Sequence, residues 1–244
     1  MQRFFTTLGG WLFRARSFLP LPLIYLVVSN SWDAHVQAGA GGPEVDEALN
    51  LLGLASCALG ALLRFVTVGL VPEGTSSQSR TLSAQALTTD GPYSVVRHPL
   101  YLGNLLITVG LLCIVHEPWA WAVGLGYWLV SHLLIVRAEE AALATTHGAA
   151  FTEWKQRVPS WVPAPWKWKP SREPFGWKRA VQREVNPLVA WGIGATLLLM
   201  WERFVRRELP GALGKRYLTL VVALLVLLAA NKVWKVIERR RRAG

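Results

Sequence analysis

The sequence predicts an all-α integral membrane protein with about six transmembrane or membrane-embedded helices. Of its 244 residues, 52% are hydrophobic and only 17% are charged, whereas an ordinary soluble domain has about 25% charged residues. The apolar stretches are too long for most soluble helices. The basic residues that give the chain a net charge of +11 lie between these stretches. This distribution excludes a disordered chain and disfavours a soluble nucleic-acid-binding protein, whose charge would gather on one polar face.

Six apolar segments supply the expected helices, and a spanning helix needs roughly 17 to 25 residues. They are 18–32, 48–71, 100–115, 119–136, 187–201 and 217–236. The second, fourth and sixth are long enough to span a membrane, whereas the other three are short. The first is also compatible with a cleaved signal peptide, because small residues follow it. A strongly basic hairpin follows the fifth, so a re-entrant or tilted interfacial segment is the alternative there.

The charges between the segments predict the topology. The loop between the first two segments holds acidic residues and no Lys or Arg, whereas basic residues crowd the N-terminus, the 137–183 region and Arg239–Arg242. The positive-inside rule therefore places both termini and the loops 72–98 and 137–186 in the cytoplasm. We expect a multi-pass protein of the bacterial cytoplasmic membrane.

Tryptophans alternate with basic residues and prolines after the fourth segment, between Trp154 and Arg179. This composition is typical of a chain at the depth of the lipid headgroups, where indoles bury their rings and cations meet anionic lipid. The prolines exclude a continuous helix that could read a nucleic-acid groove, so we expect no nucleic-acid partner. Cys57 and Cys113 stand alone in apolar runs and the five histidines are scattered, so we expect no metal site.

Two polar clusters are the candidates for function, because polar side chains are costly near a membrane. Pro99 suits the first position of a helix, which leaves His98 at the cap and directs free backbone N–H groups, with Arg97 beside them, toward an anion. Tyr101 follows one turn later. The hairpin then returns the pair Glu139–Glu140 to the same face, because each leg is about 30 Å long.

Cationic and anionic groups at one end of a hairpin suit a zwitterionic ligand, so the sequence predicts a pocket for such a ligand at the cytosolic face. The alternative is an Arg97–Glu139 ion pair that only holds the hairpin together.

These clusters resemble a known family. The resemblance is carried by Gly91-Pro92-Tyr93, the run Arg97-His98-Pro99-Leu100-Tyr101-Leu102-Gly103, Glu139-Glu140, Leu143, Gly148, Phe151, Trp154, Val158 and Pro163. Together they closely resemble the isoprenylcysteine carboxyl methyltransferase and phospholipid methyltransferase superfamily of integral-membrane enzymes. The match covers about one third of the chain, and the glutamate pair one hairpin after the arginine–histidine–proline motif makes it specific.

The resemblance implies that S-adenosylmethionine is the cofactor and that no metal is needed. The cofactor-binding residues it implies are Tyr93, Arg97, His98, Pro99, Tyr101, Gly103, Asn104, Glu139, Glu140, Phe151 and Trp154, of which Arg97 and Glu140 are the expected catalytic residues. Arg80 and Trp161 are expected to contact the acceptor substrate. The family commonly has tyrosines where Phe151 and Trp154 stand, so a phenol hydroxyl is missing there.

The implied function is transfer of a methyl group to a lipid head group or another small molecule that partitions into the bilayer. A prenylcysteine-type carboxyl methyltransferase, a small-thiol S-methyltransferase, a membrane reductase of related fold and a non-catalytic membrane protein are the alternatives. We expect three parts: N-terminal membrane helices and a cytosolic loop (1–87), the catalytic core (88–165), and an interfacial segment with C-terminal membrane helices (166–244). The expected partners are the lipid bilayer and an amphiphilic acceptor, and the sequence does not predict an oligomeric state.

Overall fold

The computed structural model describes residue 12 and residues 42–72, 87–205 and 211–243. In these ranges the chain forms five long helices: α3 (Pro43–Leu70), α4 (Pro99–Val115), α5 (Pro118–Arg157), α6 (Trp177–Val205) and α7 (Gly211–Ala243). Two short 3-10 helices, η2 (Pro92–Ser94) and η3 (Pro165–Lys167), lie in the connections. Four of the long helices have the length and hydropathy to cross a membrane, and α4 is a shorter apolar helix. The all-α membrane class is confirmed, and the expected first segment lies outside the described residues.

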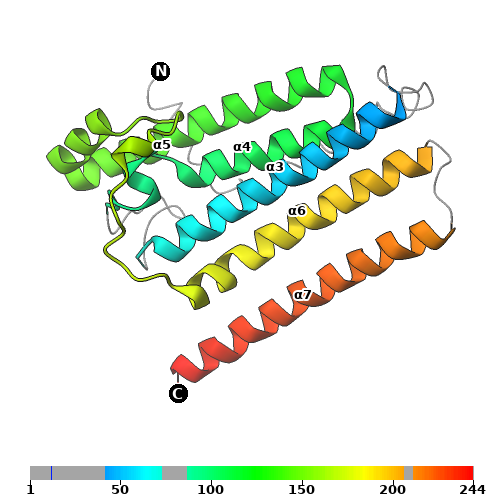
Figure 1. The fold of residues 1–244 in the computed structure, drawn as a ribbon. Helices are drawn as coiled ribbons and strands as arrows, with labels where there is room; N and C mark the ends of the chain where they lie inside the picture. The colour runs from blue at the N-terminus through cyan, green and yellow to red at the C-terminus, as the bar shows by residue number, and fades with distance from the viewer. Residues whose placement is uncertain (1–11, 13–41, 73–86, 206–210, 244) are drawn as a thin grey trace.

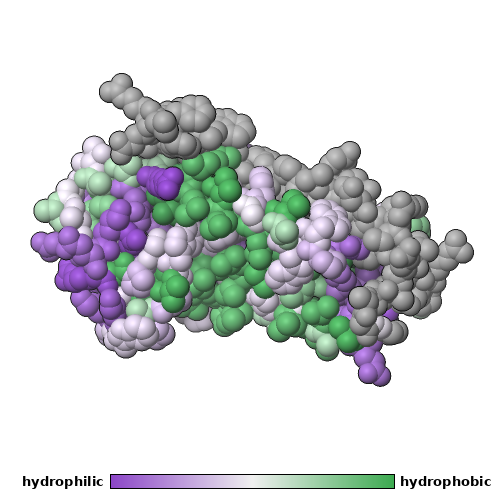
Figure 2. All heavy atoms as spheres, turned by 90° about the horizontal axis from the view of Figure 1, so that it is seen from above, coloured by the Kyte–Doolittle hydropathy of each residue, from purple (hydrophilic) through white to green (hydrophobic). Residues whose placement is uncertain are grey.

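The helices lie side by side as a bundle with two distinct ends (Figure 1). One end, which we call the site end, holds the end of α3, the beginnings of α4 and α6, and the end of α7. A broad apolar band lies between more polar ends on the face seen in Figure 2. The described residues of the loops 72–98 and 137–186, which the charge pattern places on one side of the membrane, therefore share one end of the bundle.

Helices α3 and α4 are in backbone contact at two levels. A Cβ atom on Gly53 would lie 2.5 Å from the carbonyl oxygen of Gly110, and one on Gly60 would lie 2.5 Å from that of Gly103. Only residues without side chains allow two helices to approach so closely, as small residues commonly do in membranes. Gly103 is therefore a helix-packing residue in this structure.

The start of α4 agrees with the sequence, whereas the end of α5 does not. Helix α4 begins at Pro99 with His98 as its N-cap, and His116 adopts a left-handed conformation that ends it. The sequence predicts that the next helix ends near Glu139, but α5 continues to Arg157 with a kink at Gly148, whose φ is 51°. Its 40 residues would measure about 60 Å if straight, twice a membrane's hydrocarbon thickness. The residues after Glu139 form a helical extension because they are mostly good helix formers.

The fifth apolar segment belongs to a continuous helix, so the re-entrant alternative is wrong. Helix α6 has 29 residues with Pro187 inside it, and it runs antiparallel to α7 along the bundle (Figure 1). Arg64 of α3 joins α6 to the other helices: its guanidinium makes two hydrogen bonds to Glu184, of 2.9 and 3.0 Å, and one of 2.6 Å to Asn104 of α4. Partly buried polar contacts thus hold α6, and with it the hairpin of α6 and α7, against the rest of the bundle.

Candidate functional site

Glu140 is the centre of a charged network at the site end. Its Oε1 lies 2.8 Å from Nη1 of Arg97 and 3.2 Å from Nε2 of His98, and its Oε2 lies 2.7 Å from Nζ of Lys155. The Glu140 side chain is only 12% exposed. Two side chains from the residues just before α4 and one from the α5 extension therefore converge on one carboxylate.

Glu139 forms the second half of the site. The hydroxyl of Tyr101 donates a 3.0 Å hydrogen bond to Oε2 of Glu139, and Nδ1 of His98 lies 3.9 Å from the same oxygen. Both Glu139 and His98 are buried. The two neighbouring carboxylates are thus held by different partners, and His98 lies between them.

The beginning of α4 explains why these groups gather here. Pro99 occupies the first helical position and His98 makes no side-chain cap hydrogen bond, so the positive end of the helix dipole faces the carboxylates. Nε of Arg97 is buried and has no hydrogen-bond partner in the described part of the chain. A buried donor without a partner is costly, so this end of α4 retains capacity for an anionic group.

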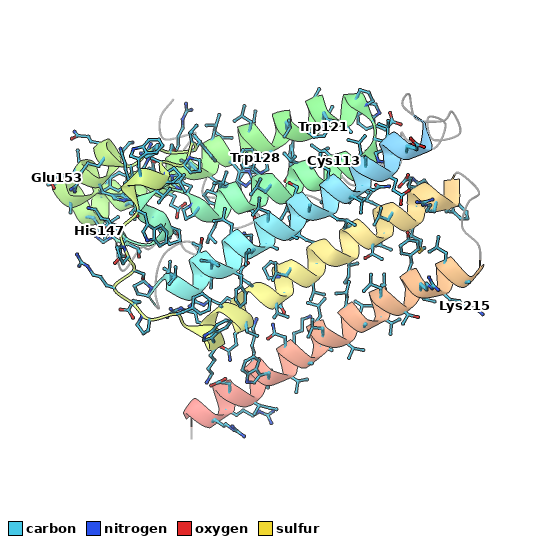
Figure 3. The ribbon with its side chains drawn as sticks, viewed as in Figure 1. Cys113, Trp121, Trp128, His147, Glu153 and Lys215 are labelled. Carbon is cyan, nitrogen blue, oxygen red and sulfur yellow. The ribbon has the colours of Figure 1, made fainter. Side chains whose placement is uncertain are left out.

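Aromatic side chains border the site on the α5 side. The His98 ring stacks on Tyr101 with centroids 5.7 Å apart and lies 6.1 Å from Trp161. Tyr101 meets His132 edge-on, and His132 stacks on Trp128 with centroids 4.2 Å apart. Trp128, labelled in Figure 3, lies on the apolar first half of α5, whereas His147 and Glu153 lie on the extension at the site end. An aromatic wall therefore leads from the charged network toward the apolar part of the bundle.

Phe151 and Trp154 pack behind the network. Both are buried with Tyr93 in a cluster at the site end, and Nε1 of Trp154 donates a 3.1 Å hydrogen bond to the Tyr93 carbonyl oxygen. The ammonium of Lys155 lies 5.8 Å from the Phe151 ring centre. These contacts fix the α5 extension against the loop that carries Arg97.

The structure gathers most of the residues singled out from the sequence and separates a few. Arg97, His98, Tyr101, Glu139 and Glu140 lie together, with Pro99 and Trp161 beside them and Tyr93, Phe151 and Trp154 behind. Gly103 and Asn104 contact Arg64 of α3 instead. The ion pair of Arg97 is with Glu140, where the sequence suggested Glu139 as the alternative partner. Arg80 lies outside the described residues.

Sequence reasoning missed Lys155 as a partner of Glu140 and gave His132 no role at the site. Lys155 stands 15 positions after Glu140, and only the extension of α5 and its kink at Gly148 bring the two together. Gly148 could have indicated the kink, because glycine is the residue that adopts a positive φ at little cost. Trp128, one helical turn before His132, could have indicated that the two rings pack together.

Comparisons with known proteins agree with this site. Residues 51–145 match the model of the isoprenylcysteine carboxyl methyltransferase (ICMT) family. The cobalt-zinc-cadmium resistance protein CzcN of Cupriavidus metallidurans is 35% identical over 77 residues, which cover 32% of this chain and 35% of that protein. Protein-S-isoprenylcysteine O-methyltransferase B of Arabidopsis thaliana is 32% identical over 118 residues, or 46% of this chain and 57% of that protein.

The chain thus spans about a third to somewhat over half of the length of these relatives. No solved structure matches significantly. The matches confirm the resemblance to the isoprenylcysteine carboxyl methyltransferase family. The matched region includes most of α3, all of α4 and the part of α5 that carries Glu139 and Glu140.

Proposed function

We propose that this chain is an integral-membrane methyltransferase that uses S-adenosylmethionine as its donor. The observation that carries the proposal is the network around Glu140, in which Arg97, His98 and Lys155 surround one buried carboxylate at the positive end of α4. The family match over α3 to α5 supports the same assignment.

The residues at the site fit the charges of this donor. Arg97 Nε, which lacks a hydrogen-bond partner in the described residues, would hold the donor's carboxylate beside the positive end of α4. Glu139 and Glu140 would accept its ammonium group. The rings of His98, Tyr101 and Trp161 would face its sulfonium, since aromatic faces attract cations. The donor carries both a carboxylate and an ammonium group. Each of these groups would replace the partner of like charge in the existing ion pairs of Arg97 and Glu140.

The bound donor supplies an electrophilic methyl group, and the protein's task is to align the acceptor and exclude water. The buried Glu139, His98 and Tyr101 would provide a site of low water content. The hydrogen bond from Tyr101 to Glu139 and the stacking of His98 on Tyr101 would fix their orientation. A carboxylate or thiolate acceptor is already nucleophilic, so these residues need not remove a proton from it.

We further propose that the acceptor is an amphiphile that enters from the bilayer. The aromatic wall of Trp128, His132 and Trp161 runs from the charged network toward the apolar bundle, which suits a substrate with an apolar tail. A prenylated cysteine carboxylate is the first candidate, because the Arabidopsis relative is named for that substrate class. A phospholipid head group is the second, and a small hydrophobic thiol is the third.

Donor binding to the purified protein in lipid nanodiscs tests the first proposal. Arg97→Ala and Glu140→Ala each remove a charge-assisted contact, so each is expected to weaken the binding of S-adenosylhomocysteine roughly ten- to a hundredfold in calorimetry. Glu153→Gln is the matched control, since Glu153 is exposed and pairs only weakly with Arg157 among the described residues. Wild-type affinity in both site variants, or binding of a nicotinamide dinucleotide in place of the donor, would overturn the assignment.

Turnover of matched acceptors tests the second proposal. Acceptors that share a nucleophile but differ in prenyl or acyl length are incubated with labelled donor, and the labelled product is quantified. We expect turnover to rise with the length of the apolar tail. A fully water-soluble acceptor that performs equally well would show that entry is from the aqueous side.

A further inference from the structure

The segment 159–172, which we call the strap, joins the end of α5 to the region before α6 at the site end (Figure 1). It forms no regular structure apart from the short helix η3. Because it connects one membrane-spanning helix to the next, and lies beside the end of α3 and the beginning of α4, it belongs at the membrane surface.

The inner side of the strap is hydrogen-bonded along the loop that carries Arg97. The N–H of Arg97 donates to the Pro159 carbonyl oxygen at 2.9 Å, and the N–H of Gly91 donates to that of Lys169 at 2.9 Å. Four more bonds join the strap to its surroundings: Ala164 N–H to Val95 O, Lys169 N–H to Ser94 Oγ, Arg172 N–H to Asp90 Oδ2, and Ser171 Oγ–H to Leu70 O. Five of these six hydrogen bonds hold the strap against the loop 90–97.

The outer side of the strap exposes large apolar side chains. Trp166 is 81% exposed, Val162 76% and Trp168 50%. Exposed indoles on a segment that lies at a membrane surface are typical of contact with the headgroup layer, where the ring is buried and the N–H stays hydrated.

The charge around the strap identifies the kind of lipid. Between positions 150 and 180 the chain has two acidic residues, Glu153 and Glu173, against seven basic ones, Lys155, Arg157, Lys167, Lys169, Arg172, Lys178 and Arg179. Lys169 and Arg172 are exposed, and the Arg172 side chain is 91% exposed. Basic residues at this depth are attracted to the negative surface potential of anionic lipids.

We propose that the strap docks onto the surface of an anionic bilayer, and that this docking stabilises the loop 90–97 and with it the position of Arg97. Docking does not depend on methyl transfer, so it stands or falls separately from the proposed function. Its consequence is that lipid composition controls how well the charged network is ordered.

Hydrogen exchange in nanodiscs tests the coupling. The full chain is placed in phosphatidylcholine alone or in an equal mixture with phosphatidylglycerol, and exchange of the Gly91 and Arg97 amides is compared. We expect slower exchange in the anionic discs, by roughly fivefold for each strap cation that contacts lipid. The variant Lys169→Gln/Arg172→Gln is expected to lose this difference. The control Arg240→Gln/Arg241→Gln removes two exposed cations from the same end of the bundle and is expected to retain it.

Fluorescence quenching by brominated lipid tests the contact itself. The double variant Trp166→Phe/Trp168→Phe is expected to lose a quenched component that the wild type shows in anionic discs. High salt is expected to abolish the exchange difference in the wild type, because it screens exposed charges, and this measurement needs no variant to fold. Equal exchange in both lipids, or a difference that persists in Lys169→Gln/Arg172→Gln, would overturn the proposal. If docking is observed but no donor binds in either disc, the proposed function fails and this inference stands.

Discussion

Replacement of Arg64 by methionine is expected to destabilise the bundle strongly. Arg64 is the partner of Glu184, which is 3% exposed, and it binds that carboxylate through Nε and Nη2 at 2.9 and 3.0 Å. The change leaves a buried carboxylate without this partner. Removal of one partner of a buried ion pair costs about 3 to 5 kcal/mol, more than the pair itself contributes.

The double variant Arg64→Met/Glu184→Leu distinguishes the interaction between the two side chains from the cost of burying a charge without its partner. With both charges removed, apolar side chains of similar volume fill the space, so we expect the double variant to be more stable than either single variant. The free energy of unfolding is measured by titration with sodium dodecyl sulfate in mixed micelles, followed by tryptophan fluorescence. Leu62→Met is the control, because Leu62 lies on the same helix and is 58% exposed.

Two results would refute this reasoning. A loss below about 1 kcal/mol for Arg64→Met would mean that the pair behaves like an exposed salt bridge. Additive losses in the double variant would mean that Arg64 and Glu184 do not act on each other, and that the contact between α6 and the rest of the bundle lies elsewhere.

Three further predictions follow from the packing, the topology and the site. Gly110→Ala places a methyl group against the Gly53 carbonyl of α3 and is expected to cost about 1 to 3 kcal/mol in the same micelle titration, whereas Gly126→Ala, with open space at its Cβ position, is expected to be neutral or slightly stabilising. Cysteines introduced at positions 90 and 145 are expected to react with a membrane-impermeant maleimide from the same side of sealed vesicles; labelling from opposite sides would contradict the hairpin. Lys155→Met is expected to lower donor affinity less than Arg97→Ala in calorimetry, because the Lys155 side chain is 47% exposed and its ion pair is weakened by water.

Hydropathy and charge predicted the features that depend on transfer of the chain into lipid. The three segments judged long enough to span a membrane became α3, α5 and α7, because each must satisfy its backbone hydrogen bonds internally. Pro99 marked the start of α4 correctly, since a missing N–H costs nothing at a first helical position. The proximity of Arg97 to Glu139 and Glu140 was predicted from the similar lengths of the two helical segments of the hairpin between them.

The rotation of the helices and the end of α5 were beyond prediction from one sequence. Glu139 and Glu140 are neighbours, yet they point about 100° apart on a helix, so packing alone decides which of them meets Arg97. The same rotation turns Gly103 and Asn104 toward α3. The place where the α5 extension packs depends on the burial of Phe151 and Trp154 against Tyr93, a contact between distant parts of the sequence that local patterns do not encode.

The two glycine contacts between α3 and α4 determine how this protein responds to bilayer thickness. Gly53 lies against Gly110 and Gly60 against Gly103, so a slide of α4 along α3 by one turn, about 5.4 Å, would place side chains where only backbone fits. The bundle therefore adapts to a thicker or thinner bilayer by tilting as a whole or by deforming the lipid around it. The charged network at the beginning of α4 therefore stays in a fixed position relative to the end of α3. A change in lipid chain length tilts the site together with the bundle, and it does not shift the site along α3.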